Sequence, residues 1–364
     1  MTETNSQEAK ELIFPGGMRE SQLYKSRADA VGKAVVGASC VQDDSASKMY
    51  DDWVYLPSIH APDFQDELKR VIENHHIISI FCPHAFVYKT LLDISKTSEV
   101  EIKFSNPPPW KTEVSDIKYY YGIAKVVREL ATRLRGEDEQ GLPCLEEIAG
   151  MLMFSQVIPG MTSDEKLAAF ISIYPDLSKG DIVEIGAYWG RSSYFLAWAS
   201  RKYKIGNLLV VDPWSQDESQ QKDSPEIMHN SEGEIIKWEP VFEGFLAALS
   251  PFTEGVNYLR MPSVEGAKIY RENKNVKSST FGETTYSGNI SLIHIDGNHD
   301  YEMVVNDCKT WLDLVQSGGW IVFDDYIWVH GDGPRRAGDE FLRENSGQID
   351  RSFVCDKSLF IRLR

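Results

Sequence analysis

The sequence predicts an α/β fold with two parallel sheets, and three observations lead to this prediction. Short apolar runs alternate with helix-like segments along most of the chain, which favours parallel strands joined by helices. The 364 residues exceed the usual size of one domain. The polar stretch GEDEQGLP, at 136–143, interrupts the alternation. We therefore expect a smaller N-terminal α/β (Rossmann-like) domain over 1–140 and a larger doubly wound domain over 141–364.

The N-terminal half alternates four apolar runs with two helical patterns. LIFPGG, KAVVGAS, WVYLP and IISIFCP read as strands, and RESQLYKSRADAVG and PDFQDELKRVIENH read as helices. FSNPPPWK, at 104–111, reads as a loop because three consecutive prolines do not propagate a helix. An amphipathic helix is expected to follow through 119–136.

The C-terminal half predicts a sheet of seven strands. Five apolar runs, DIVEIG, NLLVVD, VNYLR, SLIHID and WIVFDD, are spaced for intervening helices. The tail SFVCDKSLFIRLR reads as an antiparallel hairpin that closes the sheet. A helix is expected over 162–174, with Thr162 and Glu165 as a capping box. Doubly wound sheets bind ligands at the carboxyl ends of their strands, so the polar residues there are the candidate site.

The first of these strands ends in a glycine loop, EIGAYWGRSS. Gly186 and Gly190 permit a tight turn, and the helix beginning near Ser192 offers free N–H groups. Asp212 ends the second strand, where an acid suits the hydroxyls of a ribose. The spacing E-x-G-x-x-x-G differs from the dinucleotide pattern and fits S-adenosylmethionine better than NAD. The alternative is a plain strand–helix turn.

Acidic residues end the fourth and fifth strands. Asp296 and the pair Asp324 and Asp325 are separated by one helix and one strand, so parallel pairing brings them to one edge. Clustered carboxylates favour a cation, and oxygen ligands favour Mg²⁺, or Mn²⁺ or Ca²⁺, over zinc. The alternative for each aspartate is a turn-capping role. His299 is either a general base or a hydrogen-bonded turn residue, and His294 reads as a core residue.

Composition excludes several classes of partner. Acidic residues outnumber basic ones by 55 to 38, which argues against nucleic acid and anionic membranes. The sequence has no apolar run of membrane-spanning length and no signal-peptide pattern. Five scattered cysteines without a CxxC pair fit a reducing compartment and argue against structural zinc. A cytoplasmic protein is expected.

The motifs GAYWGRS, DGNH and FDDYIW resemble those of metal-dependent class I S-adenosylmethionine O-methyltransferases. The glycine loop is similar to that of catechol O-methyltransferases. IDGNHDY and GGWIVFDDY are closer to the mycinamicin-type O-methyltransferases of sugars and natural products. The resemblance covers about 145–364. It implies a Rossmann-like methyltransferase domain that methylates a small-molecule hydroxyl, with S-adenosylhomocysteine as the other product and Mg²⁺, Mn²⁺ or Ca²⁺ as the metal.

The resemblance also implies a role for each matching residue. Asp212 would hold the ribose, Ser263 would lie near the adenine, and His299 would be the base. Catechol enzymes have lysine at the position of His299 and asparagine at that of Asp325, so a sugar or aliphatic hydroxyl is the expected acceptor. The methionine part of the cofactor would be surrounded by Glu184, Gly186, Tyr188, Gly190 and Ser192. The metal would be bound by Asp296, Asp324 and Asp325, with Asp296 also beside the cofactor and the reacting groups.

The N-terminal half resembles, more faintly, the small Rossmann-like domain that precedes ATP-grasp domains. It is expected to bind substrate or to mediate assembly, with a purely oligomeric role as the alternative. The family resemblance implies a homo-oligomer, a dimer or a tetramer. Two other functions stay open: an inactive nucleoside-binding or scaffolding protein, and a metal-independent N- or C-methyltransferase.

Two insertions are expected to shape the acceptor pocket. One is the polar segment 215–240, and the other is 326–341. In the second, Tyr326, Trp328 and His330 are candidates for a pocket wall, and Arg335 and Arg336 for contact with an anionic group. Plain surface loops are the alternative.

Overall fold

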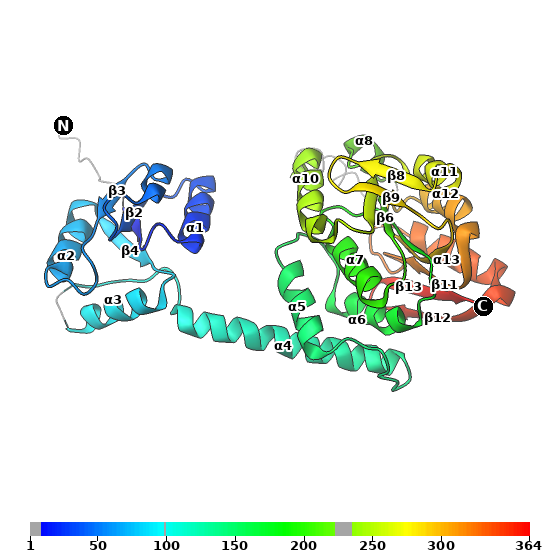
Figure 1. Ribbon diagram of the computed structural model, residues 1–364, viewed down its shortest axis with the longest axis horizontal. Helices are drawn as coiled ribbons and strands as arrows, with labels where there is room; N and C mark the ends of the chain where they lie inside the picture. Colours follow the sequence, from blue (N-terminus) through cyan, green and yellow to red (C-terminus); the bar gives the residue numbers. More distant parts are fainter. Residues whose placement is uncertain (1–8, 98–99, 223–234) are drawn as a thin grey trace. The chain divides into compact units, whose positions relative to one another are not determined.

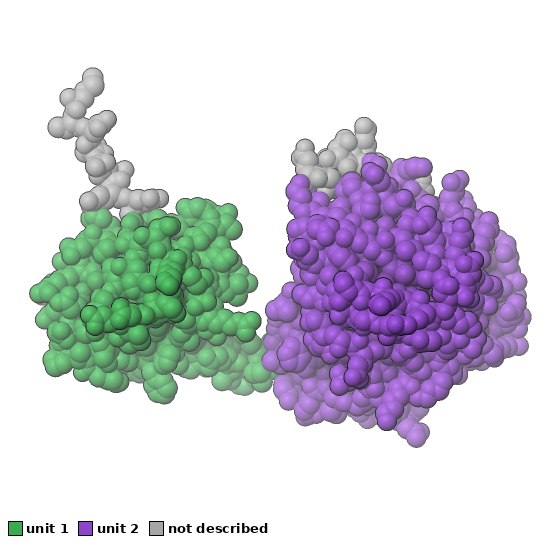
Figure 2. All heavy atoms as spheres, turned by 45° about the horizontal axis from the view of Figure 1, so that its top comes forward, with its two compact units in different colours: residues 1–119 green, residues 120–364 purple. Residues whose placement is uncertain are grey.

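The computed structural model describes residues 9–97, 100–222 and 235–364. By internal contacts the chain divides into two compact units, an N-terminal unit up to Tyr119 and a C-terminal unit from Tyr120, coloured separately in Figure 2.

The N-terminal unit is built on a parallel sheet of four strands in the order β3-β2-β1-β4, as predicted. Successive side chains of a strand point to opposite faces, so the neighbours Leu12 and Ile13 belong to different core clusters. The strands are β1 (Lys10–Ile13), β2 (Val35–Ser39), β3 (Trp53–Tyr55) and β4 (Ile77–Phe81). The helices are α1 (Arg19–Ala30), α2 (Phe64–Asn74) and α3 (Ala85–Thr97), with a 3₁₀ turn η1 (Ser45–Met49).

Helix α4 (Pro109–Leu134) begins earlier than the sequence suggested. Pro109 is its first residue, a position at which proline is tolerated because the first N–H groups of a helix have no intrahelical partner. The division between the units falls inside this helix, whereas the stretch 136–143 lies within the C-terminal unit. Ala124, Val127 and Ala131 of α4 belong to the core of that unit.

The C-terminal unit contains the predicted seven-stranded sheet, in the order β12-β13-β11-β10-β5-β6-β7. The strands β7, β6, β5, β10 and β11 run parallel, and β13 and β12 close the sheet antiparallel. Their bounds are β5 (Asp181–Ile185), β6 (Leu208–Val211), β7 (Val256–Leu259), β10 (Ile290–Ile295), β11 (Val315–Phe323), β12 (Ile349–Cys355) and β13 (Ser358–Leu363). A separate hairpin of β8 (Asn275–Ser278) and β9 (Gly282–Thr285) was not predicted.

Helices cover both faces of this sheet (Figure 1). One face packs against α4, α5 (Leu145–Ser155), α6 (Asp164–Ile173), α7 (Arg191–Tyr203) and α10 (Trp238–Leu249). The other packs against α11 (Ser263–Glu272), α12 (Tyr301–Trp311) and α13 (Gly333–Glu344). The short elements are α8 (Gln216–Ser219), η2 (Tyr174–Asp176), η3 (Ser250–Phe252), η4 (Leu312–Leu314) and η5 (Ser346–Gln348).

The direction of winding reverses between β5 and β10, which are neighbours although several elements separate them in sequence. Ligand sites of such sheets lie outside the carboxyl ends of the strands at this reversal. The glycine loop follows β5 and Asp296 follows β10, so the fold brings the two main candidate motifs to the same crevice.

The start of α6 corrects one detail of the sequence analysis. The capping residue is Ser163, whose Oγ accepts a hydrogen bond from the N–H of Lys166 at 3.0 Å, rather than Thr162. Lys166 consequently lies in the first turn of the helix, where its side chain is buried. Among the described helices, none has both the length and the apolar character needed to cross a membrane.

Candidate active site

The glycine loop after β5 lies directly against the turn after β10. Gly186 has φ +80°, and a Cβ there would lie 2.1 Å from the carbonyl oxygen of Asp296. Only glycine permits both this backbone conformation and this approach. The amide of Asp296 in turn donates to the carbonyl of Ile185 at 2.8 Å. The glycine loop and the turn after β10 are therefore in direct backbone contact.

Asp212, at the end of β6, braces the glycine loop. Its Oδ2 accepts hydrogen bonds from the backbone N–H groups of Ala187 at 2.8 Å and Tyr188 at 3.1 Å, and Oδ1 accepts from Trp214 at 2.7 Å. Burial raises the pKa of Asp212, although the three amides oppose the rise. A carboxylate offers about four acceptor positions, so one remains for a ribose hydroxyl.

The remaining residues predicted for the cofactor lie on this loop or beneath it. Gly190, with φ +89°, precedes α7, and Ser192 is in the first turn, whose N–H groups have no partner within the helix. Tyr188 adopts a left-handed backbone, φ +53°, and its carbonyl accepts from the indole of Trp214. Glu184 is fully buried and bonded to Ser193 and His294, so it lies beneath the loop.

Ser263 begins α11, is half-buried and contacts the buried residues Trp311 and Asp307. Its Oγ accepts a hydrogen bond from the indole N–H of Trp311 at 2.8 Å. The neighbouring Asp307 is buried, and burial raises the pKa of its carboxyl to about 7 despite a hydrogen bond with Ser263. The role of Ser263 near an adenine stays a prediction.

The acids after β10 and β11 surround a lysine. Lys166 Nζ lies 3.3 Å from Asp296 Oδ2 and closer still to Asp324 Oδ2, and the lysine side chain is 5% exposed. Burial alone would lower the pKa of Lys166, but the charges of Asp296 and Asp324 raise it. The lysine holds the pKa of Asp324 low, whereas burial and the charge of Asp324 raise that of Asp296. Ser358 of β13 also donates to Asp324.

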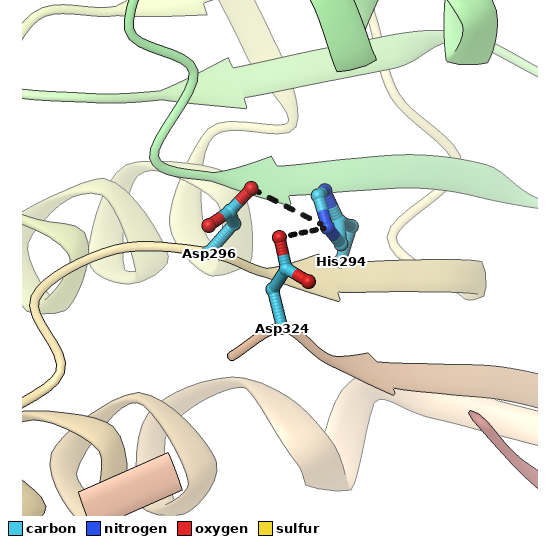
Figure 3. A group of neighbouring side chains, drawn as sticks. All are labelled: His294, Asp296 and Asp324. Carbon is cyan, nitrogen blue, oxygen red and sulfur yellow. Dashed lines mark ion pairs between the residues drawn. The ribbon is translucent and has the colours of Figure 1, made fainter. Parts of the chain in front are cut away.

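His294 of β10 points into the same group of acids (Figure 3). Its Nδ1 lies 3.0 Å from Glu184 Oε1, and its Nε2 lies 3.6 Å from Asp296 Oδ2 and 3.9 Å from Asp324 Oδ2. Burial, then the charge of Lys166, lowers the pKa of His294 and favours the neutral ring. The sequence suggested a satisfied core residue, but Nε2 has no hydrogen-bond partner among the described residues.

His299 forms a second pair with Asp325. Its Nε2 lies 3.3 Å from Asp325 Oδ2, and its Nδ1 lies 3.3 Å from the side-chain amide of Gln221. Trp328 packs edge-on against the imidazole, with ring centroids 4.6 Å apart. Burial lowers the pKa of His299, although the charge of Asp325 opposes this, so the ring is neutral near pH 7. Asp325 has the left-handed φ of 46°, a conformation uncommon for a non-glycine residue.

The predicted metal-binding aspartates therefore fall into two overlapping groups of donors. In the inner group, His294, Asp296 and Asp324 have ligand atoms within 4.8 Å of one another, and in the outer group so do Asp296, His299 and Asp325. Asp296 is common to both. Lys166 also contacts the inner group, a contact that the sequence analysis did not predict.

Of the residues suggested for the acceptor pocket, Trp328 is beside His299, whereas two others are engaged elsewhere. The hydroxyl of Tyr326 donates to Asp339, and the guanidinium of Arg336 stacks on Tyr301 at 3.8 Å. Of the polar insertion 215–240, residues 223–234 lie outside the described part of the chain.

Comparison with known proteins shows what this domain is similar to. Residues 183–326 match the family model described as "Methyltransferase domain". This part of the chain is therefore similar to methyltransferase domains. It contains the glycine loop, Asp212 and all the acids and histidines of the two donor groups. The strand order confirms the predicted fold, and the match agrees with a methyltransferase-like domain.

Individual relatives are distant. An uncharacterised protein of Acanthamoeba polyphaga mimivirus is 27% identical over 148 residues, which are 40% of this chain and 50% of that protein. The chain thus spans about half the length of this curated relative. Among solved structures, the O-methyltransferase NovP is 14% identical with a TM-score of 0.37, covering 68% of this chain and 99% of its own. MycE methyltransferase from the mycinamycin pathway, in complex with Mg, SAH and mycinamycin VI, is 12% identical with a TM-score of 0.37. The match covers 62% of this chain and 56% of MycE.

Proposed function

We propose that the C-terminal unit transfers the methyl group of S-adenosylmethionine to a hydroxyl oxygen of a small molecule. One observation carries the proposal. The glycine loop of the methyltransferase-like domain touches the turn that bears Asp296, because a Cβ at Gly186 would lie 2.1 Å from the Asp296 carbonyl oxygen. A cofactor on this loop would therefore lie beside the two acid–histidine groups, where an acceptor hydroxyl could be deprotonated.

The donor end of the site has the chemistry that S-adenosylmethionine requires. The first-turn N–H groups of α7 favour the carboxylate of the methionine part, since a helix N-terminus attracts anions. Asp212 has acceptor capacity left for a ribose hydroxyl. The bound molecule would supply a methyl group on a positively charged sulfur, which is already a good leaving group.

The acceptor end provides a base. Asp325 would keep a proton on Nε2 of His299, which leaves the lone pair of Nδ1, now facing the Gln221 amide, to accept a proton. A neutral imidazole is the form needed for this role, and the lowered pKa of His299 favours it. A carboxylate that orients a histidine and stabilises its charged form is a recurring arrangement in enzymes.

In the proposed reaction the acceptor oxygen forms a bond to the methyl carbon as the carbon–sulfur bond breaks. The electron pair of that bond goes to sulfur, which becomes the neutral thioether of S-adenosylhomocysteine. The hydroxyl proton goes to His299. Holding the two reactants in line on one rigid edge of the sheet supplies much of the acceleration.

A divalent cation fits the outer group better than the inner one. Asp296 and Asp325 would hold Mg²⁺, or Mn²⁺ or Ca²⁺, through hard oxygen ligands, and one or two carboxylates commonly suffice for Mg²⁺. Bound there, the ion would orient the hydroxyl and lower its pKa. Asp324, predicted as a third ligand, is engaged by Lys166 and Ser358.

The acceptor we propose is a hydroxyl of a sugar or of a natural product. The support is the pair His299 and Asp325, which replaces the lysine and asparagine of the catechol enzymes that the glycine loop resembles. Trp328, against the His299 ring, supplies an apolar surface for such a molecule. We also propose, from the sequence, a cytoplasmic homo-oligomer in which the N-terminal unit binds substrate or mediates assembly.

A metal-independent methyltransferase is the second candidate, and Lys166 favours it. The ammonium beside Asp296 and Asp324 already supplies a positive charge. An inactive nucleoside-binding protein is disfavoured because the acids and the two histidines of both groups are all present.

The decisive experiment uses S-adenosylmethionine labelled in its methyl group. The full-length protein is incubated with it and with metabolite extract from the source organism, with and without EDTA, and the label is followed by mass spectrometry. Label on an oxygen of a metabolite, lost with EDTA, is the expected result. Label that persists with EDTA points to the metal-independent alternative. Binding of S-adenosylmethionine with no transfer would overturn the proposal in favour of a binding protein.

A further inference from the structure

Three lone-pair donors of the inner group point toward one place. They are Nε2 of His294, Oδ2 of Asp296 and Oδ2 of Asp324, and the two oxygens lie 3.6 and 3.9 Å from the nitrogen (Figure 3). The hydrogen-bond partners fix the character of the nitrogen. Because Nδ1 faces the carboxylate of Glu184, it carries the proton, and Nε2 presents its lone pair.

A buried lone pair facing two carboxylate oxygens is unfavourable unless positive charge lies nearby. His294 is 0% exposed, and among the described residues nothing donates to its Nε2. An unsatisfied buried acceptor destabilises a folded protein. The only cation that the described residues bring to both aspartates is the ammonium of Lys166.

The location of Lys166 is unfavourable without these acids. It lies in the first turn of α6, where the positive end of the helix dipole repels a cation. Its side chain is 5% exposed, so its charge has lost most of its hydration. Removing either partner would leave a buried charge uncompensated, which indicates that lysine and acids act as one unit.

We propose that Lys166 is a tethered cation that competes with a divalent metal ion for the donors His294, Asp296 and Asp324. While the ammonium occupies this group, a metal ion is confined to the outer group and binds weakly. When its charge is removed, the inner group becomes a metal site with one nitrogen and two oxygen ligands, a set that suits Mn²⁺. Any effect of this competition on methyl transfer rests on the proposed function, but the competition itself does not.

The test measures metal binding rather than catalysis. Mn²⁺ is titrated into the metal-free full-length protein without S-adenosylmethionine, and free Mn²⁺ is followed by electron paramagnetic resonance. Lys166→Gln removes the charge and keeps a hydrogen-bonding group. We expect it to bind Mn²⁺ at least about tenfold more tightly than the wild type, since a unit charge within 4 Å of a site changes binding by this much or more.

Two matched variants define the effect. Lys166→Arg keeps the charge and should retain weak binding. Lys25→Gln removes another buried lysine, which pairs with Asp29 in the N-terminal unit, and should leave Mn²⁺ affinity unchanged. Adding Asp324→Asn to Lys166→Gln should return the affinity to that of the wild type, because it removes one of the three donors.

Equal or weaker Mn²⁺ binding by Lys166→Gln would overturn the proposal. If that variant and Lys166→Met fail to fold in metal-free buffer, the proposal requires that Mn²⁺ restore folding, and failure to do so also overturns it. Tighter binding without any methyl transfer by the wild type would support the competition and contradict only the proposed function.

Discussion

In each of the two units a glycine turn follows the first strand of the parallel sheet. Different groups lie against the two turns. In the N-terminal unit, a Cβ at Gly16 would lie 2.8 Å from the ring of Trp53, and the hydroxyl of Tyr50 donates to the Gly16 carbonyl. In the C-terminal unit, Gly186 lies against the backbone of Asp296, and Asp212 holds the loop amides.

Aromatic rings of the protein itself therefore fill the space beside the turn at Gly16. The turn at Gly186 is instead held by hydrogen bonds and lies beside charged side chains. Aromatic side chains can shift, whereas the contact of Gly186 is between two backbones at the ends of neighbouring strands. A shared supersecondary pattern therefore does not imply a shared function, and the groups at the strand ends distinguish the two sheets.

The largest expected effect comes from adding one methyl group to each turn. Gly186→Ala meets the Asp296 carbonyl and a left-handed φ, so we expect a loss of at least about 3 kcal/mol of stability and of measurable S-adenosylmethionine binding. Gly16→Ala meets a side chain and should leave methyl transfer unchanged. Calorimetric unfolding and equilibrium dialysis of both variants test this. Normal cofactor binding by Gly186→Ala would contradict the proposed site.

The second comparison concerns two His–Asp pairs with the same separation. His299 lies 3.3 Å from Asp325, and His75 of the N-terminal unit lies 3.3 Å from Asp52. His299→Asn should lower kcat by roughly 10²- to 10⁴-fold, the range typical for loss of a general base, without changing cofactor affinity. His75→Asn should change neither. Equal rates for the two variants would remove His299 from the mechanism.

The third comparison concerns two buried carboxyl groups whose pKa values shift in opposite directions. Burial raises the pKa of Asp307 to about 7, so the folded unit binds a proton that the unfolded chain has lost. The contribution of Asp307 to the stability of the C-terminal unit should therefore fall as pH rises from about 4 to 7, by up to ~1.4 kcal/mol per pH unit. Asp307→Asn should remove this contribution, so the free energy of unfolding of the variant should depend less steeply on pH in this range than that of the wild type.

Glu11 of the N-terminal unit should behave in the opposite way. Burial would raise its pKa, but hydrogen bonds led by the one from Lys33 lower it overall. Its stabilising contribution is present above its unfolded pKa and is lost as pH falls through the folded value. Glu11→Gln should thus weaken the unit at pH 7 more than at pH 3. Denaturant unfolding across this pH range checks both groups, and parallel profiles for the two variants would refute the assignment.

The smallest effects are expected from two serines, the buried Ser21 and the half-buried Ser263. Ser263 accepts from Trp311, and Ser21 donates to the carbonyl of Pro15 at 2.6 Å. Each change to alanine should cost about 1 kcal/mol of stability. Only Ser263→Ala should weaken S-adenosylmethionine binding, by less than about tenfold. Unchanged cofactor affinity in that variant would place the adenine elsewhere.

The architecture and the acids at the strand ends could be predicted because both depend on local patterns. Each strand of the large sheet is an apolar run, and Asp296, Asp324 and Asp325 follow their strands directly. The unit division inside α4 could not be predicted, because an amphipathic pattern does not reveal where the packing partner of a helix changes. Helix α5 and the β8–β9 hairpin were also not predicted from the sequence.

Lys166 was missed for a different reason. It is 130 residues from Asp296 and 158 from Asp324 in sequence, and only the packing of α6 against the sheet brings them together. A lysine in the first turn of a helix, where the dipole disfavours it, was the one available signal. His294 was missed because a histidine within an apolar strand usually reads as core.

Strand β13 follows every other strand of the large sheet in sequence, yet it lies between β11 and β12 and delivers Ser358 to Asp324. A ribosome makes the chain from its N-terminus. Ser358 is therefore made after all the acids and histidines of the two donor groups. The nascent protein therefore passes through a stage in which Asp324 lacks its hydroxyl donor and β11 has an unpaired edge. Until β13 is made, that edge offers unpaired backbone groups with which another chain could pair.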